Sequence, residues 1–458
     1  MEAGGRLTLG AFEQMWRGYW LEQLRDRAQT CLDMEMAQTS GYNMATVAGF
    51  QSLFEFAADP QLKEMAGNFL NLYWAEVVSE MHPRTGQRAS AASRDGMWSS
   101  GSMHWAKPLF YCYRWIDEPA DLTIIHTGPF AMGSFRPAPI LRGIVREPNR
   151  DDYLSTSRRS TVRRDVYYTG DYSLGTFTYD PLLEQKRPVG KNWTAEMLAA
   201  YPHRMVANLR MTMGIRFASG NGADRILVKG RGNNPPWECN GVTGRGVMIA
   251  TRSVLAGEPP PDEQLRYASN GTQVFISHRK AKPELEAWKN FEEGPAGAWH
   301  FTRSGEAYVA IRIASGGHEV SSKMITMSGR SASIEAETED GHFLNLNHLW
   351  SPVVIQMVRA KDYPSFAEFK KSVQENRFSY NSSEGHLVYV SEAGDTYDYW
   401  RRSERLPAIN GRTVESGIHL RHSDQNPYLS METGSSKAIL RCPGFEPLIL
   451  DFPELHAH

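Results

Sequence analysis

The sequence predicts an α+β protein, with an α-helical domain over residues 1–120 followed by a large antiparallel β domain over residues 121–458. Between Leu9 and Arg114 the apolar residues recur every three or four positions, which is the spacing of one helical face. After about Ala120 they form short β-branched or aromatic runs bounded by turn residues. Prolines cluster where the pattern changes, at Pro119, Pro129, Pro137 and Pro139.

Three regular helices and one shorter helix are expected in the first domain. The first begins near Leu9 and the second covers about 47–57. Asp59-Pro60 is typical of an N-cap followed by proline in the first helical turn, so a third helix should run from there to about Glu80. A fourth is expected between Ser102 and Trp115, although Pro108 lies inside it. One later helix is expected over 365–374.

Short strands should fill the rest of the chain. Since no long helices separate them, they favour an antiparallel sandwich or barrel over βαβ units. The clearest segments are 123–125, 165–168, 225–228, 246–250, 272–276, 307–313, 386–390 and 438–440.

The composition excludes several classes of protein. The 50 Lys plus Arg nearly balance the 52 Asp plus Glu, so we expect no nucleic-acid partner and no membrane association. The four cysteines form no C-x-x-C pair, and the signatures of serine hydrolases, zinc proteases and P-loop proteins are absent from the sequence. We therefore expect no metal and no cofactor.

One segment departs from this charge balance. Residues 142–164 contain seven arginines against three acids. Forked guanidinium groups suit the recognition of carboxylates or sulfates, so an anionic glycan is one interpretation of the segment. A solvated strand face is the other.

Several short motifs resemble heparinase II/III-like polysaccharide lyases. Ser40-Gly41-Tyr42 opens a helix, Glu55 to Pro60 (EFAADP) joins two helices, and Gly86 to Arg94 (GQRASAASR) forms a glycine-containing loop that ends in arginine. In the β part, the matching stretches are Asp171 to Gly175, the strand at Ala307 to Ala310, and Tyr363 to Phe369.

The resemblance implies an (α/α) toroid, here shortened, packed on an antiparallel β-sandwich, with a cleft that accepts an acidic polysaccharide or oligosaccharide. It also implies a β-elimination in which a tyrosine, with a histidine, moves protons at a uronic acid. By position Tyr42 resembles the family tyrosine, and Arg94 the loop arginine that binds a carboxylate. His104 and His203 are the candidate catalytic histidines, and Trp105, Tyr172 and His300 the further substrate-binding candidates. His278 is a weaker match.

The number of helices departs from the family pattern. Only about four precede the β domain, too few to close a toroid alone. We expect either an upstream helical segment or a second subunit of a homo-oligomer to complete the ring. No secretory signal is recognisable near Met1, so localisation stays open, with secretion or a periplasmic location expected if an upstream segment exists.

Two other functions stay open. A glycoside hydrolase on the same architecture would need two carboxylates across the cleft, for which Glu35 and Asp95 are candidates. A non-catalytic glycan-binding protein would keep the sandwich without the chemistry.

Overall fold

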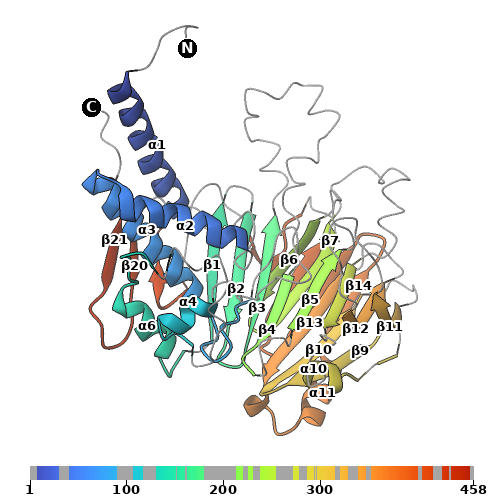
Figure 1. Cartoon of the computed structure of the whole chain (residues 1–458). Coiled ribbons are helices and arrows are strands. Elements are labelled where there is room, and N and C mark those ends of the chain that lie inside the picture. Colours follow the sequence, from blue (N-terminus) through green and yellow to red (C-terminus); the bar gives the residue numbers. More distant parts are fainter. Residues whose placement is uncertain are drawn as a thin grey trace, which may run out of the picture.

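The structure is a computed structural model of the 458-residue chain. It describes residues 8–29, 41–89, 107–116, 130, 132–150, 152–159, 162–179, 213–219, 225–230, 238–253, 272–277, 286–292, 294–295, 297–314, 320–327, 339–346, 352–400, 405–415, 425–432 and 435–453. Within them, helices and several antiparallel sheets form a mixed α+β protein, as predicted. Figure 1 shows the N-terminal helices gathered at one end of a long sheet, beside β1.

The expected helices are confirmed, with small changes at their ends. Asp59 caps α3, because its Oδ1 accepts a hydrogen bond from the backbone nitrogen of Leu62 at 2.7 Å. The predicted fourth helix ends at Cys112, three residues earlier than expected, and contains Pro108; residues 102–106 lie outside the described part of the chain. Ser365 caps α11 in the same way as Asp59 caps α3. The bounds are α1 (Leu9–Gln29), α2 (Gly41–Phe56), α3 (Pro60–Ser79), α4 (Lys107–Cys112), α6 (Pro139–Arg146), α10 (Glu286–Lys289), η3 (Ala360–Asp362) and α11 (Phe366–Glu375).

Two large antiparallel sheets form the centre of the molecule, and every expected strand among the described residues is present; the segment 123–125 lies outside them. The first sheet has the order β1 (Tyr153–Arg159), β2 (Val162–Tyr168), β3 (Tyr172–Tyr179), β4 (Met213–Phe217), β5 (Arg225–Gly230), β8 (Thr272–Ser277), β12 (Glu339–Leu346), β11 (Val320–Met327). The second has the order β6 (Glu238–Gly244), β7 (Val247–Ser253), β13 (Val353–Arg359), β10 (Ala307–Ile313), β9 (Trp299–Ser304).

These two sheets bury their facing sides in one hydrophobic core. Leu174 and Ile215 of the first sheet lie in it together with Ile311 and Ile355 of the second. The other side of the second sheet packs in a further core against α11 and a third sheet. The third sheet consists of β14 (Phe378–Asn381), β15 (His386–Val390), β16 (Thr396–Trp400), β17 (Ala408–Ile409) and β18 (Arg412–Thr413). The outer side of the first sheet is therefore the one left to meet the helices at the β1 end.

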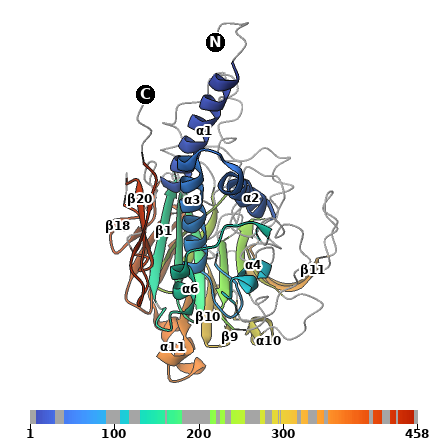
Figure 2. The ribbon, with the colours of Figure 1, turned by 60° about the vertical axis from the view of Figure 1, so that its left-hand side comes forward.

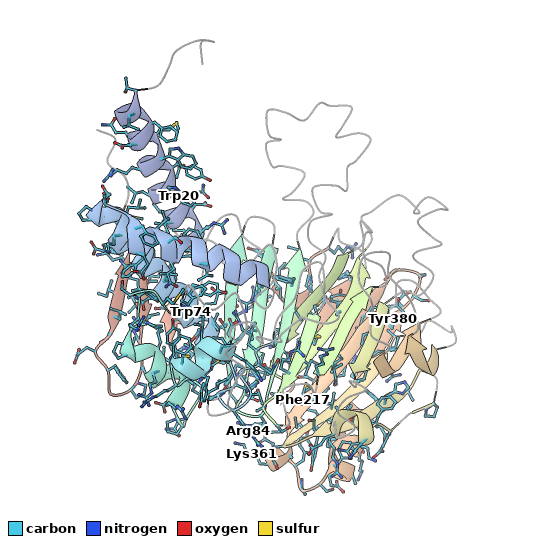
Figure 3. All side chains as sticks on the ribbon, viewed as in Figure 1. Trp20, Trp74, Arg84, Phe217, Lys361 and Tyr380 are labelled. Carbon is cyan, nitrogen blue, oxygen red and sulfur yellow. The ribbon has the colours of Figure 1, made fainter. Side chains whose placement is uncertain are left out.

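The end of the chain returns to the helical part. Strands β19 (Leu429–Ser430), β20 (Lys437–Leu440) and β21 (Leu448–Asp451) form a small sheet whose apolar residues share a core with α3 and α6. Trp74 of α3, labelled in Figure 3, lies in this core among aromatic rings that include Phe110 and Trp115. Figure 2 shows α3 in front of β1, with β20 beside it. Helix α3 is thus enclosed by segments from both ends of the sequence.

Candidate active site

The site begins at the turn that follows α3. His82 and Gln87 close this turn, since the backbone nitrogen of His82 donates to the carbonyl of Gln87 at 2.8 Å and Met81 forms a β-bridge with Arg88. Gly86 has a φ of +65°, a conformation that glycine adopts without strain. The sequence motif Gly86 to Arg94 therefore starts in a well-defined turn.

Four charged residues, which we name the paired arginine cluster, hold this turn against the first sheet: Glu76, Glu80, Arg88 and Arg164. Arg88 Nη2 lies 2.7 Å from Glu80 Oε2, and Arg164 Nη1 lies 2.9 Å from Glu76 Oε1. Arg164 also bonds to Glu80. Burial acts to raise the pKa of Glu80, but the charges of Arg164 and Arg88 outweigh it and hold the pKa below its usual value. The cluster joins α3, the turn and β2 through two cations and two anions.

A second group of polar residues surrounds the end of α3. Arg150 donates to the carbonyl of Ser79 at 2.7 Å, and its guanidinium lies 4.7 Å from the ring centre of Tyr168. Tyr153 donates to the same carbonyl. The side-chain amide of Asn426 donates to the hydroxyl of Ser79 at 3.0 Å. These bonds satisfy the carbonyl at the end of the helix.

The outer face of the first sheet carries a continuous row of side chains beneath this turn. Strand register places Tyr153 opposite Tyr168, Tyr168 opposite Ser173, Ser173 opposite Arg216, and Arg216 opposite Arg225. Residues directly opposite one another in antiparallel strands share a face, with Cβ atoms roughly 4.5–5.5 Å apart. We name these five residues the polar row. Figure 3 labels Phe217, the neighbour of Arg216 on β4, and Arg84 in the turn, both near the lower edge of the sheet.

His82 lies over the polar row. Its ring stacks on Tyr168 with the centroids 4.9 Å apart, and its Nε2 lies 3.1 Å from Ser173 Oγ. Ser173 Oγ also accepts a hydrogen bond from the backbone nitrogen of Ala89 at 3.2 Å. Burial, with a smaller contribution from the charge of Arg150, lowers the pKa of His82 to about 3. The imidazole is therefore neutral at neutral pH, and its Nδ1 has no hydrogen-bond partner among the described residues.

Arg216 is the unusual member of the row. Its side chain has no exposed surface, yet Nε, Nη1 and Nη2 all lack a hydrogen-bond partner among the residues that the structure describes. Burial, and then the charge of Arg225, lower the pKa of Arg216 well below its usual value. A buried cation beside a second cation is unfavourable unless an anion accompanies it.

The structure describes two of the seven side chains expected to form a site, and it does not bring them together. Tyr172 is buried between the first two sheets, where its hydroxyl donates to the carbonyl of Met357 at 3.1 Å. His300 is buried on β9, stacked on Phe291, and its Nδ1 accepts from the backbone nitrogen of Gly294. Neither belongs to the polar row, so we do not place them in the site.

The remaining five candidates cannot be positioned. Tyr42 is the second residue of α2, but its side chain lies outside the described part of the structure. Arg94, His104, Trp105 and His203 also lie outside the described residues, as do the weaker candidates Glu35, Asp95 and His278.

Sequence reasoning missed His82, Arg216 and Arg225. His82 had a usable signal, because it follows the acid-bearing end of α3 and opens the turn that leads to Arg94. Arg216 had none, because an arginine between Ile215 and Phe217 is typical of the solvent side of a strand. Its burial comes from the tertiary structure.

Among the seven arginines of the arginine-rich segment, Arg150, Arg163 and Arg164 make contacts within the protein. Arg150 and Arg164 are buried and engaged with the end of α3, so this part of the segment is not a solvated strand face. Arg163 points to the other side of β2 and pairs with Asp165 at 2.7 Å. Arg150 and Arg164 stabilise the contact between helix and sheet.

The site combines a neutral imidazole, a hydroxyl and an uncompensated cation on one buried face of the sheet, a combination that suits an anionic ligand and the transfer of a proton. No group of His, Cys, Asp or Glu that could hold a metal ion occurs among the described residues. None of the described helices is long and apolar enough to cross a membrane. In comparisons with known proteins, no family model matches the chain and no curated protein matches its sequence.

Proposed function

We propose that this chain is a polysaccharide lyase that cleaves a uronate-containing glycan by β-elimination. The observation that carries the proposal is the position of neutral His82, which is fixed on Tyr168 and Ser173 in the same row as the unpaired Arg216. The motif resemblance to heparinase II/III-like lyases supports the proposal. As part of it, we propose that the fold is a shortened (α/α) toroid packed on a β-sandwich.

The chemistry explains why this combination is useful. A base removes the proton at C5 of the uronate, the electron pair of that C–H bond forms the C4–C5 double bond, and the C4–O bond to the leaving sugar breaks. The leaving oxygen then takes up a proton. Negative charge accumulates on the carboxylate during proton removal, so a fixed cation or hydrogen-bond donors must meet it.

Tyr42 is the proposed acid and base, as the resemblance implies, and Arg94 a proposed carboxylate ligand. His82 becomes the proposed histidine partner in place of His104 and His203. Because His82 is neutral, it can exchange a hydrogen bond with the reacting groups without placing a second positive charge there.

Incubation with a panel of uronate polysaccharides tests the proposal. We expect ultraviolet absorbance from the unsaturated product, and a loss of at least about 100-fold in rate for Tyr42→Phe, the usual scale of acid–base catalysis. Tyr19→Phe is the matched control, since Tyr19 is an exposed tyrosine on α1.

Two outcomes would reject β-elimination, and a third would reject only the role of Tyr42. New reducing ends without ultraviolet absorbance would indicate a glycoside hydrolase. Oligosaccharide binding without turnover would indicate a glycan-binding protein. Full elimination activity in Tyr42→Phe would reject the role of Tyr42.

A further inference from the structure

Arg216 is a buried cation that stands next to a second arginine, Arg225, on the neighbouring strand. They stand opposite each other on β4 and β5, and the charge of Arg225 acts on Arg216. Like charges directly opposite in a sheet are destabilising. Folding nevertheless places Arg216 where it has no exposed surface and no hydrogen-bond partner among the described residues.

Other buried arginines in this protein do have hydrogen-bond partners. Arg88 and Arg164 are as deeply buried, yet each lies within hydrogen-bond distance of a glutamate. The Arg216 guanidinium presents five N–H donors in a planar fork, the geometry that binds the two oxygens of a carboxylate. The missing partner is therefore an oxyanion.

The neighbours of Arg216 suggest which oxyanion it takes. Ser173 lies opposite it on β3 and contacts His82, so the Arg216 guanidinium and the neutral imidazole share one face of three adjacent strands. We infer that Arg216, supported by the charge of Arg225, binds the carboxylate of a uronate sugar in the active site. This inference rests on the proposed function and adds the residue that meets the acidic group.

Access to Arg216 requires a movement of the chain. Its side chain has no exposed surface, so binding of an anion there requires a rearrangement of the residues around it. Binding should then be slower than for a preformed open pocket, because it is coupled to a conformational change.

Equilibrium binding of sodium glucuronate to the full chain, followed by intrinsic tryptophan fluorescence at constant ionic strength, tests the inference. Glucose is the uncharged comparison and sodium sulfate the alternative anion. We expect glucuronate to bind, glucose not to bind, and Arg216→Met to weaken glucuronate binding at least 10-fold. Arg216→Lys should weaken it less, because the charge remains while the fork is lost.

Arg412→Met is the matched control, because Arg412 is exposed on β18, and its affinity should stay within twofold of the wild type. Near-ultraviolet circular dichroism establishes that each variant is folded. Equal affinity in Arg216→Met and wild type would overturn the inference, as would binding of sulfate alone or equal binding of glucose.

The two proposals can fail separately. Glucuronate binding that depends on Arg216, without elimination activity on any glycan, would reject the lyase but keep the anion site. Elimination activity that Arg216→Met leaves unchanged would keep the lyase but reject the role of Arg216.

Discussion

The two groups of buried arginines on the first sheet differ in one respect. In the paired arginine cluster, Arg88 and Arg164 are each compensated by Glu76 and Glu80. One strand beyond Ser173, Arg216 faces another arginine and has no hydrogen-bond partner among the described residues. The same side chain at the same depth thus occurs in two states. Arg88 and Arg164 pair with glutamates and hold the helix against the sheet, whereas the guanidinium of Arg216 has donors that no described residue accepts.

This difference has an energetic consequence. Removing one partner of a buried ion pair leaves a charge uncompensated, which is strongly destabilising. Removing a buried charge that has no partner should instead raise the free energy of unfolding, because the folded protein no longer bears the cost of desolvating that charge. Replacing a paired and an unpaired arginine by the same residue should therefore change the free energy of unfolding in opposite directions.

The largest effect is expected for Arg164→Met. This variant leaves Glu76 and Glu80 with Arg88 alone, so the free energy of unfolding should fall by about 3–5 kcal/mol. Urea unfolding followed by circular dichroism measures it. The exposed control Arg412→Met should change the free energy of unfolding by no more than about 0.5 kcal/mol. If Arg164→Met cost no more than the control, the paired arginine cluster would not hold α3 to the sheet.

Arg216→Met should have a smaller effect on the free energy of unfolding than Arg164→Met, and in the opposite direction. Without ligand, the free energy of unfolding should rise by on the order of 2 kcal/mol, because an unpaired buried charge is replaced by an apolar side chain of similar length. Arg216→Lys keeps the charge and should show no such gain. A loss of stability in Arg216→Met would mean that the guanidinium is compensated, and the comparison between the two arginine groups would break down.

The smallest effect is expected on the pH dependence of stability, through His82. Its pKa is lowered to about 3 in the folded protein, against about 6.5 when unfolded. As the pH falls below about 6.5, the unfolded chain binds a proton that folded His82 does not, so stability is lost progressively until about pH 3. Between pH 7 and 5.5 this loss amounts to about 1 kcal/mol, which His82→Gln should not show.

Urea unfolding at both pH values measures this difference. His300→Gln serves as a comparison in another sheet, because burial lowers the pKa of His300 to about 4 and a loss of similar sign should disappear there too. Identical pH dependence in His82→Gln and wild type would show that folding does not lower the pKa of His82.

Local features of the sequence were sufficient to predict most elements of the fold. Asp59-Pro60 placed the start of α3, because caps and first-turn prolines act within a few residues. The helix expected over 365–374 is α11. The change from helical to alternating spacing separated the first four helices from the strands, but α6 and α10 lie in the part of the chain predicted to hold strands and were missed. The sequence did not indicate that β19–β21 would pack on α3, since contacts such as Asn426 to Ser79 join positions 347 apart.

The candidate site was less predictable than the fold. Of the residues proposed from sequence, Tyr172 and His300 belong to the packing between sheets and around β9, and the sequence could not reveal this because aromatic and histidine side chains occur equally in cores and clefts. His82 became visible only when the turn after α3 was seen to lie on Ser173 and Tyr168.

What the sequence alone determined is the order and type of most elements, because helix and strand periodicity and capping are local properties of the chain. Strand register and the packing of α3 decided which charged side chains lie close together. They bring Arg164 into contact with Glu76 and Glu80, and they place Arg216 opposite Arg225. Charge compensation depends on distances across the fold, which are fixed only when distant strands and helices come together.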